Sequence, residues 1–144
     1  MSILLAGFPL AISATLLIAA AAAAAGILDP HSPPSIDLPD DPLMQFLWVS
    51  GTCTIVPLEE ELIFRGAMFS LLRDRMGLIG TTLLLSALFA IAHIPAGANR
   101  FNLFTLALLS VTTCVVRERT GSISAAAITH GCYNLLVIAS IGWL

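Results

Sequence analysis

Acidic, basic and amide side chains interrupt long apolar stretches at three places in this chain of 144 residues. These polar residues are Glu59, Glu60, Glu61, Arg65, His93, His130 and Asn134. An ionisable side chain inside a membrane span costs about 2.5 to 3.5 kcal/mol even on insertion scales, so such residues are by default functional and face the protein interior. Carboxylates and imidazoles are also common general acids and bases. We therefore take these positions as the candidate site.

Helical spacing sorts these side chains into pairs. Glu61 and Arg65 are four residues apart with the acid nearer the N-terminus, which is the better order for an ion pair on one helix face. Glu60 lies about 100° around the helix from Glu61, so Arg65 does not automatically neutralise it. Glu60 is then a carboxylate in an apolar setting, available as a general base. His130 and Asn134 have the same four-residue spacing and point the same way from their helix.

The composition is that of a membrane protein. Hydrophobic residues make up 58% of the chain and charged residues 10%, and the mean hydropathy is +0.96. The stretches without any charge are residues 1–28, 42–58, 76–99, 101–116 and 120–144. A bilayer span needs about 20 apolar residues, so most of these stretches are long enough. The sequence predicts an all-α, polytopic membrane helical bundle and argues against a soluble globular domain.

Five transmembrane helices are expected from these stretches and from the residues that end them. Their ranges are 3–28, 43–72 with a bend at Pro57, 77–94, 101–116 and 122–141. Residues 29–42 hold five prolines and four aspartates, so this segment is an aqueous loop rather than a helix. The chain is divided there into residues 1–42, a helix and a loop, and residues 43–144, which contain the candidate site.

Arginines near the helix ends predict the orientation in the membrane. Arg73, Arg75, Arg117 and Arg119 fall in two loops on one side of a five-helix weave, whereas the other side has Arg100. Cytoplasmic loops carry the excess of positive residues. The N-terminus is therefore expected inside the cell and the C-terminus outside.

The candidate residues are predicted to lie at similar depth in the bilayer. A rise of about 1.5 Å per residue from the arginine-bearing loops places Glu60 at about 20 Å, His93 at about 24 Å and His130 at about 17 Å. Asn134 comes to about 23 Å on the same count. These depths lie well inside a hydrocarbon layer of about 30 Å. We expect the four side chains to converge on one cavity.

The charge pattern excludes nucleic acid as a partner. The net charge is -3 and there is no lysine, so the chain lacks a basic face. The three cysteines, Cys53, Cys114 and Cys132, are scattered through apolar stretches without paired spacing. Packing is therefore a better interpretation for them than a disulfide or a metal site.

Three motifs resemble those of the CPBP family of CAAX proteases and bacteriocin-processing enzymes, also called the abortive-infection family. Residues 60–65 match EExxxR, residues 89–93 match FxxxH, and residues 130–134 match HxxxN. Each motif alone is weak evidence, but the ordered triple on separate membrane helices is strong. The resemblance covers about residues 43–141 and leaves the first helix uncovered.

The resemblance implies an intramembrane endopeptidase of the glutamate-dependent type, which needs no cofactor. By position, Glu60 with His93 would activate the attacking water. His130 and Asn134 would stabilise the oxyanion of the tetrahedral intermediate. The Glu61–Arg65 pair would organise the site.

Two alternatives stay open on the sequence. Two histidines and a glutamate also suit a zinc site with an open coordination position, as in a metalloprotease. The polar cluster could instead hold helices together or bind a partner, as in a non-catalytic bacteriocin self-immunity or partner-regulating factor.

The expected partners are the lipid bilayer and a membrane-associated peptide or protein substrate. The short chain could also complete its site by forming an oligomer. The expected location is the plasma membrane of a bacterium, as a multi-pass protein.

Overall fold

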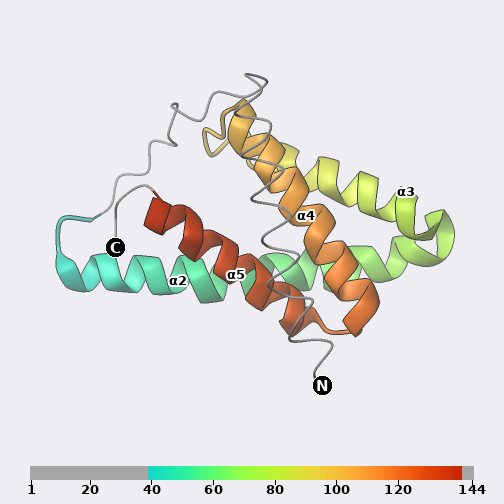
Figure 1. The fold of residues 1–144 in the computed structure, drawn as a ribbon, viewed down its shortest axis with the longest axis horizontal. Helices are drawn as coiled ribbons and strands as arrows, with labels where there is room; N and C mark the ends of the chain where they lie inside the picture. Colours follow the sequence, from blue (N-terminus) through green and yellow to red (C-terminus); the bar gives the residue numbers. More distant parts are fainter. Residues whose placement is uncertain (1–38, 141–144) are drawn as a thin grey trace.

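A computed structural model of the chain describes residues 39–140, and every regular element within that range is a helix (Figure 1). The elements are α2 (Pro42–Glu61), the π-helix η1 (Leu62–Met68), α3 (Phe69–Ala92), α4 (Arg100–Thr120) and α5 (Ile123–Ser140). The all-α class is confirmed for this range. The predicted helix at residues 3–28 lies outside the described residues.

Two helices of the described range are long and apolar enough to cross a membrane. They are Pro42–Ala92, which runs through α2, η1 and α3, and Arg100–Thr120, which is α4. The last helix contributes a shorter apolar segment, Ile123–Ala139. The count of five spans therefore stays a prediction for the whole chain.

Capping residues mark the helix ends. Asp41 accepts a hydrogen bond from the amide of Met44 at 2.9 Å, and Asn99 does the same for the amide of Asn102 at 2.9 Å. Both are N-cap contacts that satisfy amides of the first helical turn. Gly121, with a φ of 67°, ends α4 in the left-handed conformation typical of a helix C-terminus.

Gly77 turns the long helical segment back on itself. Its φ of 68° and ψ of 175° interrupt α3 in a region of backbone space that is essentially open only to glycine. Glu60 precedes Gly77 by 17 residues and His93 follows it by 16, yet their side chains approach within 3.8 Å. The chain therefore doubles back at Gly77, as Figure 1 shows at the green end of α3. The sequence placed the start of a new helix at this position.

The helix that contains Pro57 departs from regular α-helical geometry later in the chain than the sequence predicted. The prediction was a bend at Pro57, but α2 stays helical through Pro57 and the π-helix η1 follows it. Proline has no N–H, so Pro57 leaves the carbonyl of Cys53 without its helical donor. Gly131 of α5 packs against this carbonyl.

The crossing of α5 over α2 is unusually close. Gly131 of α5 faces the carbonyl oxygen of Cys53, and any Cβ at position 131 would collide with that oxygen. One turn further on, the Asn134 side-chain amide donates to the carbonyl of Thr52 at 2.9 Å. A glycine and an asparagine on α5 thus fit the stretch of α2 that precedes Pro57.

Polar side chains are buried and large apolar side chains are exposed. Glu61 and Arg65 are completely buried, whereas Phe46, Leu71 and Ile79 are 67%, 62% and 77% exposed. This pattern is the reverse of a soluble protein and suits a bundle whose outer surface meets lipid.

An ion pair ties α3 to α4 at the end that carries the arginines. The Arg73 guanidinium donates to both carboxylate oxygens of Glu118 at 2.7 to 3.2 Å. The two arginine-bearing turns therefore lie at one end of the bundle, as the sequence predicted.

Gly131→Ala is expected to lower the free energy of unfolding by about 1 to 3 kcal/mol, because the added Cβ overpacks the contact with Cys53. Gly51→Ala is the matched control on α2, since a Cβ at position 51 meets no atom within 4 Å. Thermal unfolding in detergent, followed by circular dichroism, should show a lower midpoint for Gly131→Ala alone. Equal midpoints for the two variants would contradict the close crossing.

Candidate active site

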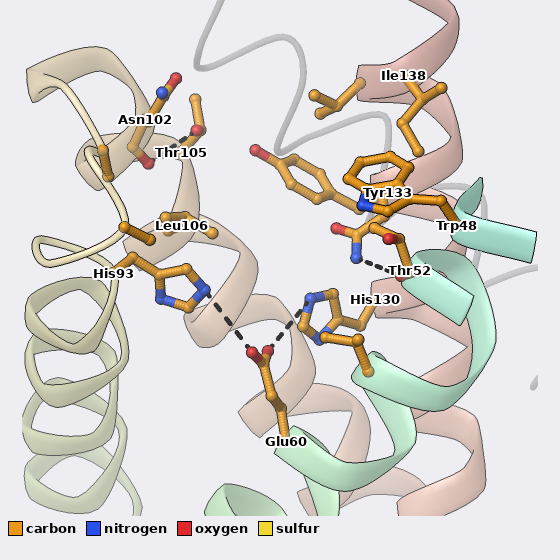
Figure 2. A pocket seen from close by; sticks show the side chains of 15 residues that line it. Trp48, Thr52, Glu60, His93, Asn102, Thr105, Leu106, His130, Tyr133 and Ile138 are labelled. Atoms are coloured by element: carbon orange, nitrogen blue, oxygen red, sulfur yellow. Dashed lines mark hydrogen bonds and ion pairs between the residues drawn. The ribbon is translucent and has the colours of Figure 1, made fainter. Parts of the chain in front are cut away.

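A cavity of about 400 Å³ is lined by all four residues that the sequence predicted as catalytic (Figure 2). Glu60 enters it from the last turn of α2, His93 from the end of α3, and His130 and Asn134 from α5. Glu59, the first of the three consecutive glutamates, is exposed and does not line it. The structure thus brings the four side chains together, while their roles stay predictions.

Each oxygen of the Glu60 carboxylate faces one imidazole (Figure 2). Oε1 lies 3.8 Å from Nε2 of His93, and Oε2 lies 3.7 Å from Nε2 of His130. These distances exceed a direct N–H···O bond of about 2.7 to 3.2 Å. A water beside Oε1 and Nε2 of His93, whose side chain is partly exposed, can bond to both atoms. The Glu60 side chain is 27% exposed, so it is open to the cavity.

The other nitrogen of each imidazole is held by an oxygen acceptor. Nδ1 of His93 lies 2.7 Å from the carbonyl oxygen of Phe89, and Nδ1 of His130 lies 3.1 Å from Oε1 of Glu61. A carbonyl or an ionised carboxylate only accepts, so each Nδ1 carries a proton. In the neutral rings Nε2 then presents a lone pair to Glu60, which requires a proton or a water between the two. The arrangement is suited to proton transfer at Glu60.

Behind the cavity wall, Glu61 and Arg65 form a completely buried ion pair. Arg65 Nη1 donates to Glu61 Oε1 at 3.1 Å, and Nη2 donates to the Oγ and carbonyl oxygen of Ser110 on α4 at 2.7 and 2.9 Å. The guanidinium also lies 5.1 Å from the ring centroid of Phe89, a favourable cation–π contact. The prediction that Glu61 and Arg65 pair on one helix face is confirmed.

His130 lies beside both glutamates. The sequence predicted that His130 shares one cavity with Glu60, and both residues line the same cavity. In the structure His130 spans both glutamates, with Nδ1 on Glu61 and Nε2 near Glu60. The reason is the close α2–α5 crossing at Gly131, the residue next to His130.

Asn134 forms a hydrogen bond between helices, which is the structural role that the sequence left open as an alternative to catalysis. Its Nδ2 donates to the carbonyl oxygen of Thr52. An amide nitrogen carries two hydrogens, so this bond orients Asn134 and leaves the second N–H for the cavity that it lines. A structural and a catalytic role for Asn134 are therefore compatible.

The side chains around Glu60 match zinc by type but not by arrangement. Histidine nitrogens and a carboxylate are ordinary zinc ligands, and the oxygen acceptors at both Nδ1 atoms are typical second partners of such histidines. Within residues 39–140, however, no group of three histidine, cysteine, aspartate or glutamate side chains is placed to hold a metal ion.

Several partners of the site residues were not predicted from the sequence. Ser110 accepts hydrogen bonds from Arg65, and the backbone carbonyl of Thr52 accepts one from Asn134. Arg117 donates to the backbone carbonyl of Arg65. The one available signal was Ser110, a hydroxyl in the apolar stretch 101–116. Backbone acceptors have no signature in the sequence.

Comparison with protein families identifies the class of protein. A family model described as type II CAAX prenyl endopeptidase Rce1-like matches residues 42–136, from the first residue of α2 into α5. The chain belongs to this family, and the resemblance drawn from the three motifs is confirmed. No match was found among curated proteins or among solved structures.

Arg65→Ala is expected to lower the free energy of unfolding by about 3 to 5 kcal/mol, because it leaves Glu61 as a buried charge without its cation. The double variant Glu61→Gln/Arg65→Gln removes both charges and should recover part of that loss. Chemical unfolding in mixed micelles measures both values. Equal losses in the single and the double variant would show that the two residues are not coupled.

Proposed function

We propose that this chain is an intramembrane endopeptidase in which Glu60, with His93, activates the water that attacks a peptide bond. The observation that carries the proposal is the position of the Glu60 carboxylate, with an imidazole Nε2 3.7 to 3.8 Å from each oxygen. A general base must reach its proton directly or through one water, and the partly exposed side of the site, between Glu60 and His93, suits that water. Membership of an endopeptidase family supports the same reaction.

In the proposed reaction, a water held by Glu60 and His93 gives a proton to the Glu60 carboxylate while its oxygen bonds to the peptide carbonyl carbon. The carbonyl oxygen becomes an oxyanion, which N–H groups stabilise. Glu60 then passes the proton to the amide nitrogen as the C–N bond breaks. The products are a new carboxyl terminus and a free amine.

His130 and Asn134 are the proposed donors to the oxyanion. Asn134 has a second N–H beyond the one that bonds Thr52. His130 would donate from Nε2 when its ring carries a second proton, and the Glu61 carboxylate at its Nδ1 would then stabilise the positive charge. Glu61 and Arg65 organise the site through this contact.

The cavity also suggests the class of substrate. Its walls are mainly apolar and include Val56, Leu106 and Ile138. Such a surface suits a membrane-associated peptide or a lipid attached to it, and the family description names a CAAX prenyl endopeptidase. We propose a membrane-associated peptide or protein as the substrate, with a prenylated CAAX tail as the first to test. The proposed location is the plasma membrane of a bacterium, as a multi-pass protein.

Glu60→Gln is expected to lower kcat at least about 100-fold, because the amide keeps the size of the side chain but does not accept the proton. The assay is mass-spectrometric detection of the tripeptide released from a farnesylated CAAX peptide by the chain reconstituted in lipid vesicles. The same peptide without the farnesyl group shows whether the lipid is required. Glu59→Gln is the matched control and should retain activity, since Glu59 is exposed outside the cavity.

The thermal midpoint of Glu60→Gln should equal that of the wild type, because Glu60 faces the cavity and is not part of the buried pair. Full activity of this variant would contradict the proposal, and loss of folding would favour an interaction protein. Cleavage should also survive dialysis against EDTA. A loss that zinc restores would instead assign a metalloprotease.

A further inference from the structure

The π-helix η1 leaves one backbone carbonyl without a donor from its own helix. The amide of Phe69 donates to the carbonyl of Phe64, five residues earlier. Regular α-helix begins at Phe69, where the hydrogen-bond spacing changes from five residues to four. Such a change of spacing passes over one carbonyl, and the carbonyl expected to lack a helical donor here is that of Arg65, which follows Phe64.

Arg117 of α4 supplies the missing donor. Its guanidinium Nε donates to the carbonyl oxygen of Arg65 at 3.1 Å, across 52 residues of sequence. Arg65 is completely buried and hydrocarbon offers no donor, so neither bulk water nor lipid replaces this bond. The carbonyl that the π-helix frees is therefore satisfied from α4.

Helix α4 holds Arg65 at two points. Ser110 accepts from its guanidinium, and Arg117, about two turns later, donates to its backbone. The residue after Arg117 is Glu118, whose ion pair with Arg73 fixes this end of α4 against α3. Contacts of both α3 and α4 thus fix the position of Arg117 relative to η1.

We infer that Arg117 is a positioning residue for the proposed reaction. It holds η1 in the π-helical form that aims Arg65 at Glu61, and Glu61 in turn orients His130 beside Glu60. Arg117 does not line the cavity, so it acts on the reacting groups through Arg65. This inference rests on the proposed function.

Arg117→Met tests the inference, because methionine keeps the apolar stem and removes the N–H donors. We expect kcat on the farnesylated peptide to fall about 10- to 100-fold with KM within about threefold, since the apolar walls that bind the substrate are unchanged. Arg117→Lys keeps a charged donor nitrogen and should recover kcat to within about tenfold of the wild type. Arg119→Met is the matched control: it removes the same charge from an exposed position on α4 and should change both constants less than about twofold.

Amide hydrogen exchange gives a readout that does not depend on activity. Peptides spanning residues 62–70 should exchange faster in Arg117→Met than in the wild type and in Arg119→Met. A kcat for Arg117→Met equal to that of Arg119→Met, or no recovery in Arg117→Lys, would overturn the positioning role even where Glu60→Gln behaves as proposed. If the wild type cleaves neither peptide, the proposed function fails, and unchanged exchange in Arg117→Met would then overturn this inference as well.

Discussion

The buried carboxylate of Glu61 sets the geometry of the whole site. It is completely buried, and its Oε1 accepts from Arg65 on η1 and lies against Nδ1 of His130 on α5. Removing a charge from water costs several kcal/mol, so the donors that compensate this carboxylate must stay in place. Glu60, the preceding residue, is thereby held at the cavity wall, with one imidazole facing each of its oxygens.

The same contacts that pack the helices also assemble the chemistry. Pro57 frees a carbonyl on α2, and Gly131 lets α5 approach that carbonyl without a side chain between them. Glu60 follows Pro57 by three residues and His130 precedes Gly131, so the close crossing brings His130 beside Glu60. A change that spreads these two helices would therefore separate the base from an imidazole.

Residue spacing was sufficient to predict the buried pair and the shared cavity. The four-residue interval of Glu61 and Arg65 and the common depth of Glu60, His93 and His130 are properties of regular helices, which the sequence reveals. The π-helix was not predicted, because it depends on tertiary contacts. Ser110 and Arg117 were missed for the same reason: they bond to Arg65, in part through backbone groups, from a helix far away in the sequence.

The most direct test of the account follows the oxygen of the attacking water. A single turnover in water enriched in the heavy oxygen isotope, with the enzyme in excess over the farnesylated peptide, is analysed by mass spectrometry of both product and protein. If Glu60 activates a water, one heavy oxygen enters the new carboxyl group of the product and the protein peptide that contains Glu60 stays unlabelled. An unlabelled product with the label in the Glu60 peptide would mean that the carboxylate itself attacks the peptide bond, and would contradict the account.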